Sequence, residues 1–169
     1  MKVLKITTSV LLLGMSLFAH AASFCVSNST MLETVLDIAE SNGQSDEIKI
    51  VSGNYIPLND WGFRFYLGEN HGLDISGGWS SGCASQSLNP LDTVLEGDNS
   101  KQVISFYTDQ SSPDITTSIS ISILSIMNGF YHEHGTTVIN TSGLGFRLNV
   151  HHLGSVVIDR LFFMGNRSN

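Results

Sequence analysis

Histidines form the sharpest cluster of chemically capable side chains in this sequence. His132 and His134 are two positions apart, and His151 and His152 follow further along the chain. Two histidines at that spacing on a strand share a face, and a neighbouring strand could add a third, which is the ligand set that zinc and copper prefer. The first pair, however, stands in a loop-like context, and no carboxylate can be named to orient the rings. These four residues are therefore weak metal candidates, and exposed histidines without a metal are the favoured interpretation.

Carboxylates could serve glycan cleavage in two ways. A polysaccharide lyase needs a carboxylate cluster for calcium and a base beside the sugar ring, but Asp109 and Asp114 only flank a loop. A glycoside hydrolase needs two carboxylates at a set separation, and the best pair, Asp92 with Glu96 or Asp98, surrounds a turn. These acids are interpreted as solvated turn residues. Calcium is expected only under the lyase alternative.

Aromatic residues near the first strands are candidates for stacking on sugar rings, namely Tyr55, Trp61 and Tyr66. The alternative is burial, because large rings favour the core, as Phe63 and Trp79 are expected to do. The sequence has no Gly-rich phosphate loop and no recognisable Ser-His-Asp order, which argues against the common nucleotide-binding and catalytic-triad signatures.

One helix is expected near the start of the chain. Thr30 followed by Glu33 makes a capping box, and apolar residues then recur at helical spacing on one face. Asn42-Gly43 supplies a stop. The pattern predicts a helix from about Met31 to Ser41 that caps the open end of a sheet, with an ordinary surface helix as the alternative.

After the helix the chain reads as short strands separated by Gly, Asn, Asp and Ser turns. The strongest signal is Ile119 to Gly129, which is echoed 37 residues later by Val156 to Asn166. Without a gap, Ile121 aligns with Ile158, and large apolar residues alternate with small or polar ones in both copies. A unit this narrow buries its apolar face only when copies stack, as in a solenoid.

Roughly nine strands are expected from these patterns. They are 48–51, 63–67, 73–75, 93–95, 103–107, 119–126, 137–139, 146–150 and 156–163. A sandwich or jelly roll would join consecutive strands by short hairpin turns. The gaps from Ser76 to Thr93 and from Thr108 to Thr117 are too long for such turns, so parallel stacking is favoured.

These motifs together resemble a known architecture. A helix ending in Ser-Asn-Gly is followed by EIKIVSGNY, LDISGGWSSGC, TVLEGDN, ISILSIMNG and GSVVIDRLFFMGN. This succession is similar to the N-terminal part of bacterial secreted right-handed parallel β-helix proteins, the pectate-lyase-like and polymorphic outer membrane protein-like group. The resemblance implies an all-β fold, a right-handed parallel β-helix (solenoid) of about five coils with an N-terminal capping helix. Because this fold hosts lyases, hydrolases, adhesins and proteins without catalysis, it implies no single function.

Residues 1–21 are predicted to be a signal peptide. Two lysines precede the apolar run Val10 to Phe18, and Ala19-His20-Ala21 matches a signal-peptidase site. The apolar core, about ten residues, is too short for a membrane anchor, which needs about 20. In an exported chain the two cysteines, Cys25 and Cys83, favour a disulfide, with two buried thiols or a redox pair as alternatives.

The charge argues against two classes of partner. The sequence has 8 Lys and Arg against 15 Asp and Glu, a net charge of -7, and signal-peptide removal takes two lysines away. The remaining basic residues are scattered singly, so nucleic acid and anionic membranes are not expected as partners. Acidic glycans are disfavoured as tight ligands for the same reason unless calcium bridges them.

Residues 22–169 are expected to form one domain that is incomplete at its C-terminus. The last strand is among the most apolar and only a turn follows it, so missing C-terminal coils or a partner chain are expected at this open end. The sequence predicts a secreted or bacterial cell-surface, adhesion-type scaffold that binds a carbohydrate or host cell-surface ligand, without catalysis or cofactor. A polysaccharide lyase or glycoside hydrolase of the pectate-lyase-like fold is the alternative.

Overall fold

The computed structural model describes residues 21–66, 68, 70–107, 117–131, 145–149 and 153–168. The predicted signal peptide, except Ala21, and the predicted strand 137–139 lie outside these residues. The elements in chain order are β1 (Ala22–Val26), α1 (Ser29–Ala39), β2 (Asp46–Val51), β3 (Gly53–Tyr55), β4 (Phe63–Tyr66), β5 (Leu73–Trp79), η1 (Pro90–Asp92), β6 (Thr93–Glu96), β7 (Ile104–Tyr107), β8 (Thr117–Met127), β9 (Phe130–Tyr131), β10 (Phe146–Asn149), β11 (Leu153–Met164) and β12 (Arg167–Ser168).

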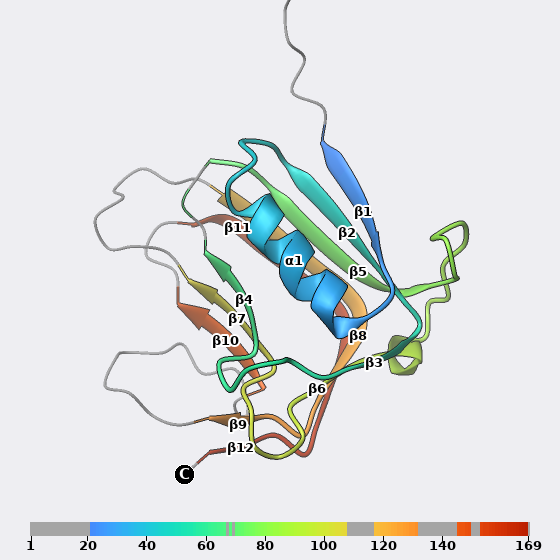
Figure 1. Ribbon diagram of the computed structural model, residues 1–169, viewed down its shortest axis with the longest axis vertical. Coiled ribbons are helices and arrows are strands. Elements are labelled where there is room, and N and C mark those ends of the chain that lie inside the picture. The colour runs from blue at the N-terminus through green and yellow to red at the C-terminus, as the bar shows by residue number, and fades with distance from the viewer. Residues whose placement is uncertain are drawn as a thin grey trace, which may run out of the picture.

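The strands form three sheets (Figure 1). Sheet A has seven strands in the order β1-β2-β5-β8-β6-β3, with β11 also paired to β8, and sheet B has the order β10-β7-β4. The third sheet is the pair β12-β9. All pairings between these strands are parallel, so the antiparallel sandwich rejected from the connection lengths is not formed by the described residues.

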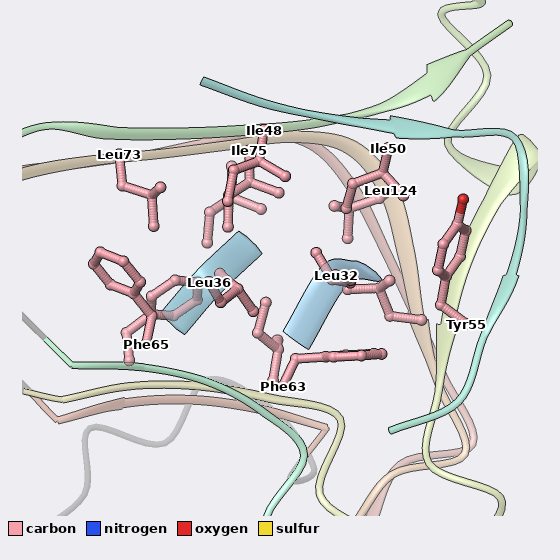
Figure 2. Packing of buried hydrophobic residues seen from close by; sticks show 14 of the residues in the cluster. Leu32, Leu36, Ile48, Ile50, Tyr55, Phe63, Phe65, Leu73, Ile75 and Leu124 are labelled. Carbon is pink, nitrogen blue, oxygen red and sulfur yellow. The ribbon is translucent and has the colours of Figure 1, made fainter. Parts of the chain in front are cut away.

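Helix α1 joins the two larger sheets. It packs against β1 and β2 of sheet A and against β4 of sheet B, and it lies between these strands in Figure 1. Its buried face, Leu32, Val35, Leu36 and Ala39, belongs to the same apolar cluster as the inward residues of both sheets. Figure 2 shows Leu32 and Leu36 between the apolar side chains of the two layers.

The helix begins two residues before the predicted start. Asn28 is the N-cap, because its side chain accepts a hydrogen bond from the Met31 N–H at 2.9 Å. The predicted capping box is not formed, since the Glu33 carboxylate instead accepts the Leu58 N–H at 2.8 Å. Glu33 therefore fastens the loop before β4 to the helix.

The repeat detected in the sequence is confirmed as a strand pair. β8 and β11 pair in parallel with Ile121 opposite Ile158 and Leu124 opposite Leu161. The turns that follow also stack, because the Asn166 side chain accepts the Gly129 N–H at 2.8 Å.

The prediction of an all-β, right-handed parallel β-helix of about five coils is wrong. The fold is mixed, because α1 supplies part of the core and lies between a half-barrel-like sheet A and the smaller sheet B. The strands also do not stack as uniform coils. β8 has a left-handed residue, Ile123 with φ 55°, and its two halves pair with different strands, β5 and β6. A period-two pattern does not reveal such a change of direction inside a strand.

The predicted disulfide is confirmed. Cys25 of β1 and Cys83 of the loop after β5 are bonded, with their Cα atoms 5.8 Å apart. The bond closes a sequence separation of 58 residues that includes α1 and the first strands of both larger sheets.

Replacing Leu36 tests the role of the helix in the core. Leu36 is 1% exposed and Ile38, two residues along, is 44% exposed. We expect Leu36→Ala to lower the free energy of unfolding by about 2 to 5 kcal/mol because it leaves a cavity. Ile38→Ala is the control and should change it by less than about 1 kcal/mol. Equal losses in urea titrations of the two variants would contradict this packing.

Removing the disulfide should also destabilise the fold. A double Cys25→Ala, Cys83→Ala variant is expected to lose about 2 to 4 kcal/mol, because its unfolded chain is less constrained. Urea titration measures this loss. Thiol labelling of the unreduced wild type should find no free cysteine, and two labelled thiols would refute the bond.

Candidate ligand-binding site

Sheet B carries a row of polar side chains on its outer face. The register places Arg64 of β4 and Arg147 of β10 on either side of Ser105 of β7. The residues next to them in each strand, such as Phe63 and Phe106, point into the core. Because neighbouring strands are about 4.8 Å apart, the two arginines leave a slot roughly two strand spacings wide over the small serine.

This row lines a hollow of about 260 Å³, which we call the arginine hollow. Its lining residues are Trp61, Arg64, Gln102, Ser105, Tyr107 and Arg147. Ser105 and Gln102 are buried, whereas Trp61 is 55% exposed. The hollow therefore has a polar floor, two cationic sides and an exposed indole.

The loop that carries Trp61 is docked onto the segment before β7. The Gln102 N–H donates to the Asp60 carbonyl at 3.1 Å, and the Phe63 N–H donates to the Val103 carbonyl at 2.8 Å. Gly62 makes this contact feasible, because it has φ +77° and an added Cβ would lie 2.5 Å from the Gln102 carbonyl oxygen. The position of Trp61 is thus fixed by backbone contacts.

Arg64 is held by an aromatic pair. Its Nη2 donates to the Tyr107 hydroxyl at 2.7 Å, and its guanidinium carbon lies 5.0 Å from the Tyr107 ring centroid. The Tyr107 ring in turn lies 5.1 Å from that of Tyr66, so the two tyrosines form a support. A guanidinium has five N–H donors, and this arrangement uses only part of them.

Gln102 carries a buried donor. The residue is 5% exposed, and its Nε2 has no hydrogen-bond partner within the part of the chain that the structure describes. Leaving such a group unsatisfied costs about 1 to 3 kcal/mol. An acceptor oxygen at the floor of the hollow would relieve this cost.

A second hollow of about 220 Å³ adjoins the first and is acidic. The two share Arg64 and Tyr107, and the acidic one is also lined by Glu33, Asp37 and Glu40 of the α1 region. Burial raises the pKa of Glu40, although the Tyr66 N–H, which donates at 2.6 Å, and Arg64 act in the opposite direction. Together the two hollows fall within the range of about 300 to 1,000 Å³ typical of ligand pockets.

A further hollow, of about 420 Å³, is a weaker candidate. It lies over the first residues of β2, β5, β8 and β11 and is lined by small, aliphatic and acidic residues. It has no aromatic ring and no cationic side chain among its lining residues. It therefore lacks the stacking surface and the charged donors that the arginine hollow combines.

The three predicted stacking residues are in different environments. Tyr55 is 1% exposed, its hydroxyl donates to the Val51 carbonyl at 2.7 Å, and burial raises its pKa to about 12, so its ring belongs to the core. Tyr66 supports Tyr107 and lines neither the arginine hollow nor the acidic one. Trp61 is the one of the three that lines the arginine hollow.

Sequence reasoning missed Arg64, Gln102 and Arg147. The available signal was the recurrence of Phe-Arg at 63–64 and 146–147, where an apolar inward residue precedes a cation. Gln102 had no signal, because an isolated glutamine before a strand looks like any surface residue.

The metal candidates His132, His134, His151 and His152 lie outside the described residues. Among the residues that are described, no group of three or more His, Cys, Asp and Glu could hold a metal ion. Glu96 has a structural role, because the Asn54 and Asn128 side chains donate to it and lower its pKa. Calcium binding therefore stays a prediction of the lyase alternative.

Comparisons with protein-family models, curated proteins and solved structures returned no match to this chain. The resemblance to exported β-helix proteins is thus not tested by these comparisons, and the assignment of function depends on the geometry of the site. No helix in the described residues is long and apolar enough to span a membrane.

Glu40 allows a test by pH. Because its pKa is raised, the folded protein binds this proton more tightly than the unfolded chain does. The resulting stability is fully present below the ordinary value of 4.5 and is lost as the pH rises through the folded pKa. Glu40→Gln removes this titration and keeps an acceptor oxygen for the Tyr66 N–H. In urea titrations, wild-type stability relative to Glu40→Gln should decline above pH 4.5, whereas parallel pH curves would contradict the burial of this carboxyl.

Proposed function

We propose that this chain is an exported, non-catalytic carbohydrate-binding protein whose glycan occupies the arginine hollow and stacks on Trp61. The observation that carries the proposal is the exposed indole of Trp61 beside a floor formed by the buried Gln102 and Ser105. Ligand sites combine apolar or aromatic surface with a few placed polar groups, and a sugar ring needs both.

The polar groups suit sugar hydroxyls. Arg64 and Arg147 offer donors, while Ser105 and Tyr107 carry hydroxyl groups that both donate and accept. The carboxylates of the adjoining acidic hollow accept hydrogen bonds from hydroxyl groups. A ligand of one or two sugar rings could therefore find partners along both hollows.

The placement of the acids supports binding without catalysis. Glu33 and Asp37 of α1 and its C-cap residue Glu40 follow one another at helical spacings of four and three residues, so they lie on one side of the helix. Glycoside hydrolysis needs two carboxylates on opposite sides of the scissile bond. Acids on a single wall do not meet this requirement.

Export is supported by the disulfide. Bonds such as that between Cys25 and Cys83 persist in oxidising compartments and are rare in the cytosol. Together with the signal peptide predicted from the sequence, this favours a protein that meets glycans outside the cytoplasm or at the cell surface.

Binding to immobilised neutral and acidic glycans tests the proposal. Trp61→Ala should weaken binding at least about tenfold, because removal of an aromatic anchor typically costs more than about 1 kcal/mol. Leu88→Ala is the matched control, since Leu88 is 60% exposed, close to the 55% of Trp61, and does not line the hollow. Retention of no glycan by the wild type, or release of shortened glycan products, would overturn the proposal.

A further inference from the structure

We infer that the sugar bound in the arginine hollow carries a carboxylate, which lies over Ser105 between Arg64 and Arg147. The inference rests on the proposed function and adds the chemical class of the ligand, a sugar acid. Three features of the hollow carry it, namely the spacing of the arginines, the buried amide of Gln102 and the acidic wall next to Arg64.

The spacing of the row fits one carboxylate. Arg64 and Arg147 occupy the same register position on β4 and β10, two strands apart, with the smaller Ser105 between them. Long guanidinium side chains starting roughly 10 Å apart can converge on one group above a small central residue. A carboxylate accepts the paired N–H donors of a guanidinium in its own plane, which a neutral hydroxyl cannot do.

Arg64 is ready for such a ligand. Its hydrogen bond to the Tyr107 hydroxyl fixes the guanidinium, and no carboxylate of the described residues forms an ion pair with it. Ion pairs within the described part of the chain include Lys49 with Glu47 and Arg160 with Asp159. Arg64 is therefore positioned by Tyr107, and although it acts on Glu40 through its charge, it makes no close ion pair with a described carboxylate.

Gln102 is the second, independent sign of a ligand. Gln102 lines the hollow, is 5% exposed and has a buried Nε2 without a hydrogen-bond partner among the described residues. A carboxylate has about four acceptor sites, and a paired contact from one guanidinium with a single N–H from the other uses about three of them. The site that remains could accept the buried amide N–H.

The acidic wall selects against more highly charged ligands. Glu33, Asp37 and Glu40 border Arg64 on the side of α1. They would repel a phosphate dianion about twice as strongly as a single carboxylate, and they can accept hydrogen bonds from the hydroxyls of the sugar. The net charge of -7 had argued against acidic glycans without calcium. Salt screens charges that lie more than about 8 to 10 Å from the bound sugar, so the charged side chains nearest the hollow affect the choice of ligand more than the net charge does.

Titration calorimetry with matched sugars tests the inference. Glucuronate and galacturonate are compared with glucose and galactose, with a metal chelator present to exclude calcium bridging. The wild type should bind each acid at least about tenfold more tightly than its neutral counterpart, and added salt should reduce this ratio. Arg147→Gln and Arg64→Gln should bring the ratio close to one, because acid binding falls further than neutral-sugar binding when the charge is lost and an amide donor is kept.

Two further variants distinguish the hollow from general charge effects. Lys49→Gln removes a cation that lies over Trp79, 5.0 Å from its ring, and should keep the full preference for acids. Gln102→Leu should lower the acid preference without changing the net charge. Melting curves check that each variant is folded. Arg64→Lys should keep part of the preference for acids, because it keeps the positive charge and loses the paired N–H donors.

The outcomes separate the two claims. Equal affinity of the wild type for acidic and neutral sugars, or a preference that disappears with the chelator, would overturn the carboxylate inference and leave carbohydrate binding intact. Binding of neither kind of sugar at millimolar concentration would overturn both. An acid preference that survives both arginine substitutions would place the carboxylate elsewhere and refute the site.

Discussion

One apolar core holds sheet A, sheet B and α1 together, and the exposed chemistry of sheet B depends on it. On the buried face of sheet B, phenylalanine rings of neighbouring strands pack against one another. The ring centroids of Phe65 and Phe106 are 6.3 Å apart, and those of Phe106 and Phe146 are 5.8 Å apart. Because side chains alternate along a strand, burying these rings turns Arg64 and Arg147 outward. The packing that stabilises the fold, part of which is seen in Figure 2, therefore also sets the register of the arginine hollow.

Net charge and local charge lead to different conclusions about ligands. The chain is acidic overall, and its few cations look scattered when they are read along the sequence. Parallel pairing through β7 brings Arg64 and Arg147 into one row, although they are far apart in the chain. At the same site, Glu40 and its neighbours on α1 form an acidic border. A surface with positive and negative side chains next to each other can discriminate between ligands by the position of the negative charge on the ligand.

Local patterns predicted the local parts of the structure well. The predicted helix differed from α1 by two residues at each end, and the predicted Cys25–Cys83 disulfide was confirmed. The 37-residue repeat gave the register in which β8 and β11 pair. The architecture was not predictable in the same way, because the left-handed turn at Ile123 inside β8 leaves no trace in hydrophobic alternation. The candidate site was found only in part. Trp61 was one of three stacking candidates, but the arginine row and the buried Gln102 depend on pairings between distant strands.

The two tryptophans of the chain provide the most direct test of the central claim, that ligand binds in the arginine hollow. Trp61 lines the hollow, whereas the Trp79 indole N–H donates to the Ser76 hydroxyl at 2.9 Å, near the end of β5. The measurement is a titration of the ¹⁵N-labelled protein with glucuronate, followed by the two indole N–H resonances. If the ligand binds in the arginine hollow, the Trp61 resonance will shift until the protein is saturated, and the Trp79 resonance will not shift. A saturable shift of Trp79 with an unchanged Trp61 would contradict this account.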